Sequence, residues 1–403
     1  MTTSDSTRPW YILPVIVLSQ FAGTSLWFAG NAVIGDLQQD LGLAAGAVAN
    51  LTSAVQFGFI TGTLIFAFFA ISDRYSPRWI FVLSSIAGAS FTALIPTLAQ
   101  GMSSLLVLRF LTGFMLAGIY PVGMKIAAGW YRRSLGNALG YLVGALVLGT
   151  AFPHLLKALG ADLPWRAILY LVAAVAASGG VIMGVLVPNG PYLAQGQKFD
   201  PLCVIRLFKI RNFRSAALGY FGHMWELYTF WAFVPFLITR TSAVSVMHPS
   251  LLAFVVIAAG TLGCILGGYV SGHWGSHRVA FFQLFVSGLC CLISPLLFGA
   301  GAVWVLIILI LWGVTVVGDS PQFSTLVAQA APSHLVGSGL TIVNSIGFAI
   351  TIFSIQLLGW VTAHLESEYV FLLLFLGPLV GLLSMRPIPG DSDGMDQKEV
   401  ANC

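Results

Sequence analysis

Apolar stretches of roughly 20 residues, the length that an α-helix needs to cross the hydrocarbon core of a membrane, recur along the whole chain between short polar breaks. Only 8% of the 403 residues carry a charge, whereas 58% are hydrophobic. A soluble protein has about a quarter charged residues, so this chain has too few polar side chains to cover a globule of its size in water. The sequence therefore predicts an integral membrane protein that lies in a lipid bilayer.

The apolar stretches predict an all-α membrane protein with twelve transmembrane helices. The expected helices cover residues 11–35, 46–71, 79–99, 103–126, 136–158, 165–187, 214–240, 248–270, 279–299, 302–328, 335–360 and 365–385.

Lysine and arginine are distributed unevenly over the breaks between these helices. The even-numbered breaks and the termini hold Arg8, Arg74, Arg78, Arg132, Arg133, Lys198, Arg206, Lys209, Arg211, Arg214, Arg278, Arg386 and Lys398. The odd-numbered breaks hold only Lys157, Arg166 and Arg240. Because loops rich in lysine and arginine stay on the cytoplasmic side, we expect a multi-pass protein of the plasma (cell inner) membrane with both termini in the cytoplasm.

One long polar connection lies at the middle of the chain and divides the expected helices into two groups of six. We therefore expect an N-terminal bundle over residues 1–187, a cytoplasmic central loop over 188–213, a C-terminal bundle over 214–385 and a cytoplasmic tail over 386–403. Features of the two halves align at an offset of about 200 residues: SDRYSPR at 72–78 with SGHWGSHR at 271–278, and GIYP at 118–121 with GDSP at 318–321. This alignment predicts an internal repeat.

The chain resembles the major facilitator superfamily (MFS) over nearly its full length. The loop after the second helix is similar to that family's cytoplasmic signature, Gly-x-x-x-Asp-Arg-x-Gly-Arg-Arg, through Asp73, Arg74 and Arg78, which the resemblance implies to be a gating loop. Phe69, Ser76 and Pro77 replace two glycines and an arginine of that signature.

The fourth expected helix, RFLTGFMLAGIYPVG, is similar to the fourth-helix motif of the same family through Arg109, Gly113, Gly118 and Pro121. The resemblance implies two six-helix pseudo-repeats, secondary transport by alternating access, and a central cavity lined by helices one, four, seven and ten.

Four charged residues fall inside expected helices, namely Arg109, Lys125, Glu226 and Asp319. Each charge at the centre of a membrane helix costs about 2.5 to 3.5 kcal/mol, so each calls for an explanation. Lys125 lies close enough to the cytoplasmic end to extend its ammonium group to the membrane surface.

The sequence predicts a proton-coupling site formed by Glu226, His223 and Asp319. Glu226 and His223 are three residues apart, on one face of the seventh helix. A membrane-buried carboxylate and a histidine can both exchange protons near neutral pH. Asp319 lies between Gly318 and Pro321, where a proline loosens the tenth helix. The alternative is that these groups only hold helices together.

Polar and aromatic residues predicted to bind substrate lie on the first, fourth and tenth helices. They are Gln20, Trp27, Asn31, Arg109, Tyr120 and Gln322. A guanidinium can pair with an anion through two hydrogen bonds, which favours an anionic solute. The alternatives are that Arg109 clamps a neighbouring backbone carbonyl and that the amides bond between helices.

Several functions are excluded by missing motifs. The chain has no GxxxxGK[ST] phosphate loop and no GxSxG or HExxH motif, so we expect no enzyme, no catalytic residue and no ATP-driven step. Its five cysteines lack metal-ligand spacing, and we expect neither a metal nor a cofactor. A net charge of +4 is too small for nucleic-acid binding.

These observations together predict a secondary active transporter that moves a small, anionic organic solute by proton-coupled symport. Two alternatives remain open. The chain could be a drug/proton antiporter that exports lipophilic compounds, because the acidic pair suits a cation. It could also be a sensor or assembly partner that keeps the fold without transporting.

Overall fold

The computed structural model describes residues 9–44, 46–131, 135–160, 163–193, 206–332, 335–365 and 367–385. Over these ranges every regular element is an α-helix or a short 3-10 helix, which confirms the all-α fold class. The expected cytoplasmic tail and the basic residues Arg8, Arg132, Arg133, Lys198, Arg386 and Lys398 lie outside the described residues.

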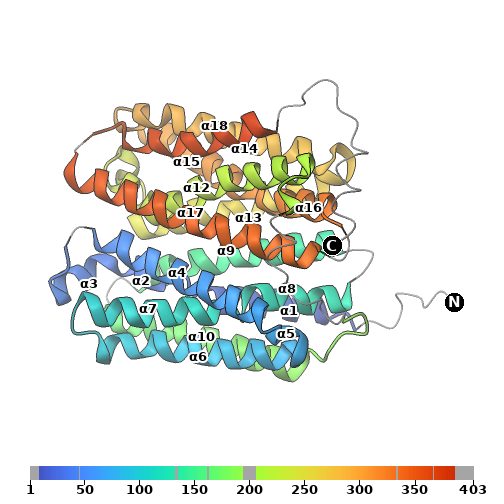
Figure 1. The fold of residues 1–403 in the computed structure, drawn as a ribbon. Helices are drawn as coiled ribbons and strands as arrows, with labels where there is room; N and C mark the ends of the chain where they lie inside the picture. Colours follow the sequence, from blue (N-terminus) through green and yellow to red (C-terminus); the bar gives the residue numbers. More distant parts are fainter. Residues whose placement is uncertain are drawn as a thin grey trace.

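The helices form two layers, with the N-terminal half below and the C-terminal half above in Figure 1. The lower layer contains α1 (Ile12–Thr24), α2 (Ala29–Ala32), α3 (Ile34–Leu41), α4 (Ala47–Phe68), α5 (Ile71–Arg74), α6 (Pro77–Leu98), α7 (Met102–Leu116), α8 (Tyr120–Trp130), α9 (Leu135–Leu159) and α10 (Trp165–Leu186). The upper layer contains α12 (Arg211–Thr239), η2 (Ser242–Ser245), α13 (Pro249–Trp274), α14 (Ser276–Ile293), η3 (Ser294–Phe298), α15 (Ala302–Gly318), α16 (Ser320–Ala330), α17 (Val336–His364), η4 (Val370–Phe375) and α18 (Leu376–Ser384). The domain boundaries themselves stay predictions.

Nine helical stretches of the described chain are long and apolar enough to cross a membrane. Two shorter apolar stretches, Ile12–Thr24 and Val370–Ser384, lie where the first and last spans were expected, and α12 is 29 residues long. The positions agree closely with the expected spans, while the count of twelve stays a prediction.

Three of the expected spans are interrupted at or beside predicted site residues. The first breaks between Thr24 and Ala29, where the chain turns before it continues as α2 and α3. The fourth and tenth break at GIYP and GDSP, so that Pro121 and Pro321 fall in the first turn of α8 and α16. Proline fits this position because the first turn of a helix leaves its backbone N–H groups unpaired anyway. The two aligned motifs therefore perform the same structural role.

The two halves also repeat one close contact between helices. A Cβ atom added to Gly113 of α7 would lie 2.1 Å from the carbonyl oxygen of Val55, and one added to Gly313 of α15 would lie 2.0 Å from that of Val256. Both positions require glycine because a side chain would collide with backbone of the neighbouring helix. The offset of 200 residues seen in the motifs thus recurs in the packing.

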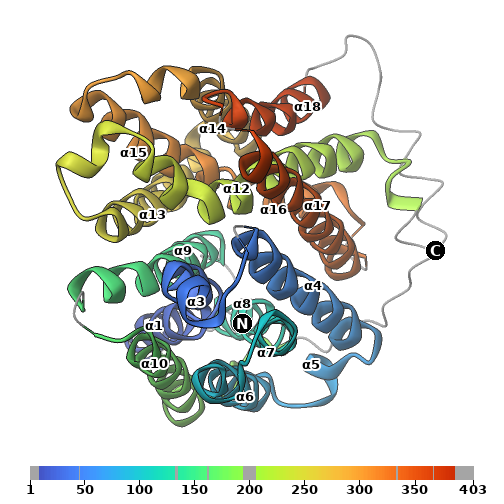
Figure 2. The same cartoon turned by 90° about the vertical axis from the view of Figure 1, so that its left-hand side faces the viewer.

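The halves meet along two pairs of helices, α9 against α13 and α4 against α17, which face each other across the middle of Figure 2. Tyr141 of α9 and Tyr269 of α13 share a hydrogen bond of 2.8 Å between their hydroxyls. Across the other pair, Nε2 of Gln356 donates to Oγ of Ser53 at 2.9 Å. Hydrogen bonds between side chains thus join the two halves at both pairs of helices.

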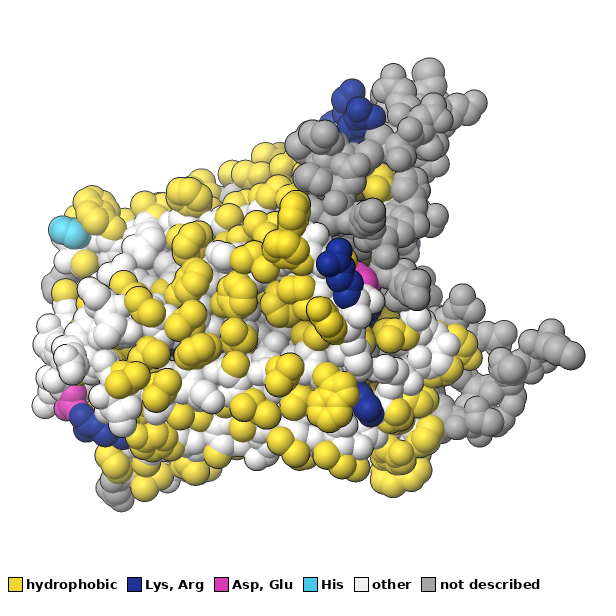
Figure 3. Space-filling view, turned by 60° about the horizontal axis from the view of Figure 1, so that its bottom comes forward, with side chains coloured by type: hydrophobic (Ala, Val, Ile, Leu, Met, Phe, Trp, Pro, Cys, Tyr) yellow, Lys and Arg dark blue, Asp and Glu magenta, His cyan; other side chains and the backbone are white. Residues whose placement is uncertain are grey.

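Hydrophobic side chains cover the middle of the surface shown in Figure 3, and charged side chains lie toward its two ends. At one end, Lys125 pairs with Asp73 of α5. At the other, Lys157 pairs with Asp36 at 2.7 Å. This distribution is typical of a protein with an apolar belt between two polar surfaces.

Candidate functional site

Arg109 forms hydrogen bonds to the backbone at the break in the first span. Its guanidinium donates hydrogen bonds to the carbonyl oxygens of Leu26, at 3.1 Å, and of Trp27. Because the helix is interrupted there, those carbonyls do not accept a hydrogen bond from a backbone N–H of the same helix. Arg109 lies on α7 and is fully buried. Among the described residues no carboxylate forms an ion pair with it. The arrangement matches the expected clamp on a carbonyl, while substrate binding by Arg109 stays a prediction.

The break places Trp27 at the junction of the two halves. Its ring lies 4.9 Å from that of Phe59 on α4 and 6.4 Å from that of Tyr120 on α8. From the other half, Tyr228 of α12 and Phe348 of α17 each come within 5.6 Å. We call these five residues the aromatic junction; it brings two predicted substrate residues, Trp27 and Tyr120, together with three that the sequence analysis did not select.

The predicted amide residues on the first span occupy different surroundings. Gln20 of α1 is fully buried beside Gly123 of α8, and neither atom of its amide has a hydrogen-bond partner within the described chain. Asn31 of α2 donates from Nδ2 to Oγ1 of Thr52 on α4 at 2.7 Å. The break therefore separates residues that an unbroken helix would have placed in one stripe.

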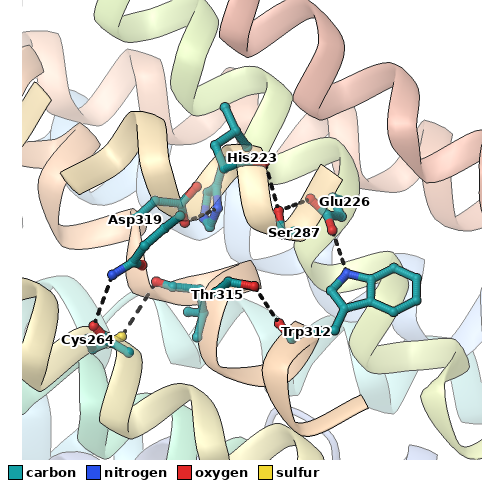
Figure 4. A network of polar contacts seen from close by, with 11 residues as sticks. His223, Glu226, Cys264, Ser287, Trp312, Thr315 and Asp319 are labelled. Carbon is teal, nitrogen blue, oxygen red and sulfur yellow. Dashed lines mark hydrogen bonds and ion pairs between the residues drawn. The ribbon is translucent and has the colours of Figure 1, made fainter. Parts of the chain in front are cut away.

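His223 and Asp319 meet at the break of the tenth span. Nδ1 of His223 on α12 lies 2.8 Å from Oδ1 of Asp319, which stands between α15 and α16, and both side chains are at most 1% exposed. Figure 4 shows the imidazole directed at the carboxylate. Gln322, three residues further on, is also buried. Two of the three predicted proton-coupling residues thus form a pair.

Glu226 points in another direction, into the C-terminal bundle (Figure 4). Its carboxylate accepts hydrogen bonds from Nε1 of Trp312 at 2.6 Å, Oγ of Ser287 at 2.9 Å and Sγ of Cys291 at 3.2 Å. These donors come from α15 and α14, so Glu226 joins α12 to two neighbouring helices. Sequence reasoning missed all three donors because a serine, a cysteine and a tryptophan on apolar helices look like ordinary packing residues.

The predicted gating-loop residues lie at one end of the N-terminal half. Asp73 accepts a hydrogen bond from Nζ of Lys125 on α8, which also donates to the carbonyl of Ser72 at 2.7 Å. Arg74 is exposed, and the guanidinium of Arg78 lies 5.2 Å from the ring centre of Trp79. Asp73 therefore connects the loop to the fourth span, and its gating role stays a prediction.

No group of three or more His, Cys, Asp or Glu side chains in the described part of the chain has the arrangement of a metal site. His223 and Asp319 lie within ion-pair distance of each other, and Glu226 accepts hydrogen bonds from Trp, Ser and Cys donors.

The fold and this arrangement of buried charges define a membrane transporter of the two-bundle type. The chain belongs to the Major Facilitator Superfamily: the family model matches residues 15–355. The resemblance noted in the sequence is thereby confirmed.

Two curated relatives match part of the chain. A Haemophilus influenzae protein whose name proposes metabolite transport is 35% identical over 135 residues, which are 30% of this chain and 32% of the relative. An Escherichia coli protein named a probable galactarate/D-glucarate transporter, GudP, is 27% identical over 149 residues, 35% of this chain and 33% of the relative. The matched segments thus span about a third of each relative.

Two solved structures share the fold over nearly the whole chain. A bacterial homologue of the human lysosomal transporter Spinster, in an inward-facing and occupied conformation, superposes with a TM-score of 0.66 at 15% identity, covering 94% of both chains. The nucleoside transporter NupG, as a point mutant, superposes with a TM-score of 0.71 at 14% identity, covering 93% of this chain and 98% of that one. At these identities the likeness concerns the fold alone.

Proposed function

We propose that this protein is a secondary transporter of the plasma membrane that couples proton movement to the symport of a small organic anion by alternating access. Both termini and the central loop face the cytoplasm in this proposal, in accordance with the positive-inside rule. The observation that carries the proton coupling is the pairing of His223 with Asp319 at a helix break, where both side chains are buried.

A buried histidine–aspartate pair can change its net charge by taking up or releasing one proton. Asp319 lies at the junction of α15 and α16, and His223 lies on α12, so a change in their contact acts on two helices of the C-terminal half. Protonation that weakens the contact would favour one arrangement of the helices over the other, which is the requirement for coupling.

Glu226 is the second proton-coupling candidate, and its surroundings suggest a different contribution. Three donors satisfy its carboxylate and connect α12 to α14 and α15. We propose that Glu226 keeps α12 in position for His223, which lies one helical turn earlier. A proton exchange at Glu226 itself would require these donors to rearrange.

An anionic solute fits the charge distribution of the N-terminal half. Arg109 is a buried positive charge whose hydrogen bonds go to backbone oxygens. The name of the Escherichia coli relative supplies two first candidates, galactarate and D-glucarate, which are dicarboxylates. We propose that Trp27, Asn31, Gln20, Tyr120 and Gln322 contact the solute when the halves separate.

The test uses the protein in proteoliposomes with an inward proton gradient and labelled D-glucarate or galactarate. We expect accumulation in the wild type and its loss in Asp319→Asn, while exchange of labelled for unlabelled solute without a gradient persists. Glu226→Gln is measured in parallel, since the side chain keeps its shape and loses the ability to ionise. If Asp319→Asn accumulates solute as the wild type does, the coupling assignment to the His223–Asp319 pair is wrong.

One observation favours a second candidate, export of lipophilic compounds: aromatic rings from both halves line the junction around Trp27. The same vesicles distinguish it, because an exporter would respond to lipophilic cations and ignore carboxylates. A protein that binds solutes without moving any of them across the vesicle membrane would support a sensor instead.

A further inference from the structure

Gln56 is a fully buried residue of α4 that faces the break in the first span. Its Oε1 accepts a hydrogen bond from Nε1 of Trp27 at 3.1 Å. An indole nitrogen can only donate, so this bond identifies which end of the amide is the oxygen. The amide nitrogen of Gln56, which carries two N–H donors, has no hydrogen-bond partner in the described chain.

Asn31 presents the complementary case on the other side of the break. Its Nδ2 donates to Oγ1 of Thr52, and the Thr52 hydroxyl donates its single proton to the carbonyl of Val48 at 2.7 Å. Thr52 can therefore only accept from Asn31, which fixes the orientation of that amide too. Oδ1 of Asn31 is buried and accepts no hydrogen bond from any described residue.

The unpaired donor belongs to α4, and the unpaired acceptor belongs to a residue that is bonded to the adjacent turn of α4. Thr52, which holds Asn31, and Gln56 are four residues apart on α4 and so occupy adjacent turns of one face. Trp27, which holds Gln56, stacks on Phe348 of the opposite half with ring centres 5.6 Å apart. Through Trp27, the amide of Gln56 is therefore next to the junction of the two halves, where the proposed function places the solute, and Asn31 is bonded to the adjacent turn of α4.

Buried polar atoms in proteins are nearly always paired, so this unpaired donor and this unpaired acceptor call for a group that supplies both functions, either a solute or a water. A hydroxyl group does so, since it donates one hydrogen bond and accepts others. The positive charge of Arg109 is close as well, because its Nε would lie 3.4 Å from a Cβ placed on Gly30, the residue before Asn31.

We propose that Gln56 and Asn31 form a subsite that binds a hydroxyl group of the solute and so select a polyhydroxylated carboxylate over a plain one. Trp27 and Thr52 are positioning residues that aim the two amides. This inference rests on the proposed function and narrows its substrate class from organic anions to hydroxylated ones.

The test compares two six-carbon dicarboxylates: D-glucarate, which carries hydroxyls, and adipate, which carries none. Dissociation constants are measured by calorimetry on the purified full chain. We expect the wild type to bind D-glucarate roughly tenfold or more tightly than adipate, the effect of one or two net hydrogen bonds. In Gln56→Met this ratio should fall toward one through weaker D-glucarate binding, with adipate unchanged.

Two further variants keep the test decisive. Gln356→Met is the matched control, because Gln356 lies at the same interface of α4 and α17 and its amide nitrogen already bonds Asn50 and Ser53; its ratio should equal that of the wild type. Gln56→Glu keeps an acceptor for Trp27 and removes the donors, so it should lose the preference even if Gln56→Met folds poorly.

Two results would overturn the subsite: equal affinity of the wild type for both acids, or a preference for D-glucarate that persists in both Gln56 variants. Either result would indicate that waters form the missing hydrogen bonds of these amides. Proton-driven transport in the vesicle assay would then still support the proposed function. Failure of every hydroxylated acid to bind overturns the subsite as well, and only the absence of all transport would remove the proposed function with it.

Discussion

The buried charges of the two halves have different kinds of partner, backbone in the N-terminal half and side chains in the C-terminal half. In the N-terminal half, Arg109 donates to backbone carbonyls of Leu26 and Trp27. In the C-terminal half, Glu226 and Asp319 face side chains, namely Trp312, Ser287 and Cys291 for the first and His223 for the second. The halves share the breaks at GIYP and GDSP and their close glycine contacts. The break that Arg109 clamps has no counterpart in α12, which is continuous over Arg211–Thr239, so the halves differ in this break as well as in the partners of their charges.

A backbone carbonyl cannot gain or lose a proton, whereas a histidine paired with an aspartate can. The contact made by Arg109 is therefore insensitive to pH, and it fixes the shape of the break around Trp27. The strength of the His223–Asp319 contact and of the hydrogen bonds to Glu226, in contrast, depends on protonation. Under the proposed function, the N-terminal half would mainly shape the solute site and the C-terminal half would mainly respond to protons.

The largest effect is expected for Arg109→Met, which leaves the carbonyls of Leu26 and Trp27 unpaired in the membrane. Loss of two charged hydrogen bonds should destabilise the protein by about 3 kcal/mol or more and abolish solute binding. The midpoint of thermal unfolding in detergent, measured at one heating rate, reports this change. Arg166→Met is the control, because the side chain of Arg166 is 50% exposed in its pair with Asp40. This variant should lower the free energy of unfolding by less than about 1 kcal/mol. Equal midpoints for the two variants would contradict the clamp.

A smaller effect is expected for Trp312→Phe, which removes one of the three donors to Glu226. The loss of one hydrogen-bond donor to a buried carboxylate should lower the free energy of unfolding by about 1 to 3 kcal/mol. If Glu226 positions α12, this variant should also weaken proton-driven accumulation while exchange without a gradient persists. Trp304→Phe is the control on the same helix, since Trp304 is 67% exposed on the outer surface. A lowered unfolding midpoint with unchanged accumulation would make Glu226 a purely structural residue.

The all-α fold class and the positions of most helices could be predicted from the sequence. A membrane helix needs a long apolar stretch, and short polar segments separate these stretches in the sequence. The aligned motifs GIYP and GDSP lie where two spans break, although only the tenth helix was expected to be loosened, by Pro321, and both spans were expected as continuous helices. The break at residues 25–28 could not be predicted: it contains no proline, and it depends on Arg109, a residue more than 80 positions away.

The candidate site was predictable in its charges and not in its contacts. Charged residues inside apolar helices are conspicuous, and this identified Arg109, Glu226 and Asp319. Their partners depend on the rotation of each helix, which a sequence without strong polar stripes does not specify. Gln56 was missed for a related reason: a single glutamine on an apolar helix usually bonds a neighbouring helix.

The loop at residues 72–78 and its aligned segment at 271–278 extend the comparison of the halves to one polar end of the molecule. Asp73 pairs with Lys125 in the first, whereas in the second, five residues beyond Gly272, which aligns with Asp73, His277 contacts the carbonyl of Met385 at 3.1 Å. Both partners of the first pair are 22% exposed, so Asp73→Asn should change stability by less than about 1 kcal/mol. If this pair holds one conformation of the transporter, the variant should change the rate of solute exchange about two- to fivefold, and His277→Asn should change it less. Identical rates in both variants would remove the gating role from Asp73.

The smallest effect concerns the backbone of the same two loops. Ala70, before α5, has a φ of 50°, and Gly275, before α14, has a φ of 81°. A left-handed backbone costs an alanine about 1 kcal/mol and a glycine almost nothing, so Ala70→Gly should raise the midpoint of thermal unfolding slightly. Ala67→Gly is the control three residues earlier, in the last turn of α4, where the same exchange should lower the midpoint because glycine has a weaker helix propensity than alanine, by at most about 1 kcal/mol. If the two variants shift the midpoint in opposite directions, the backbone at Ala70 is strained whereas that at Gly275 is not. If both variants shift the midpoint in the same direction, the two loops do not differ in this way.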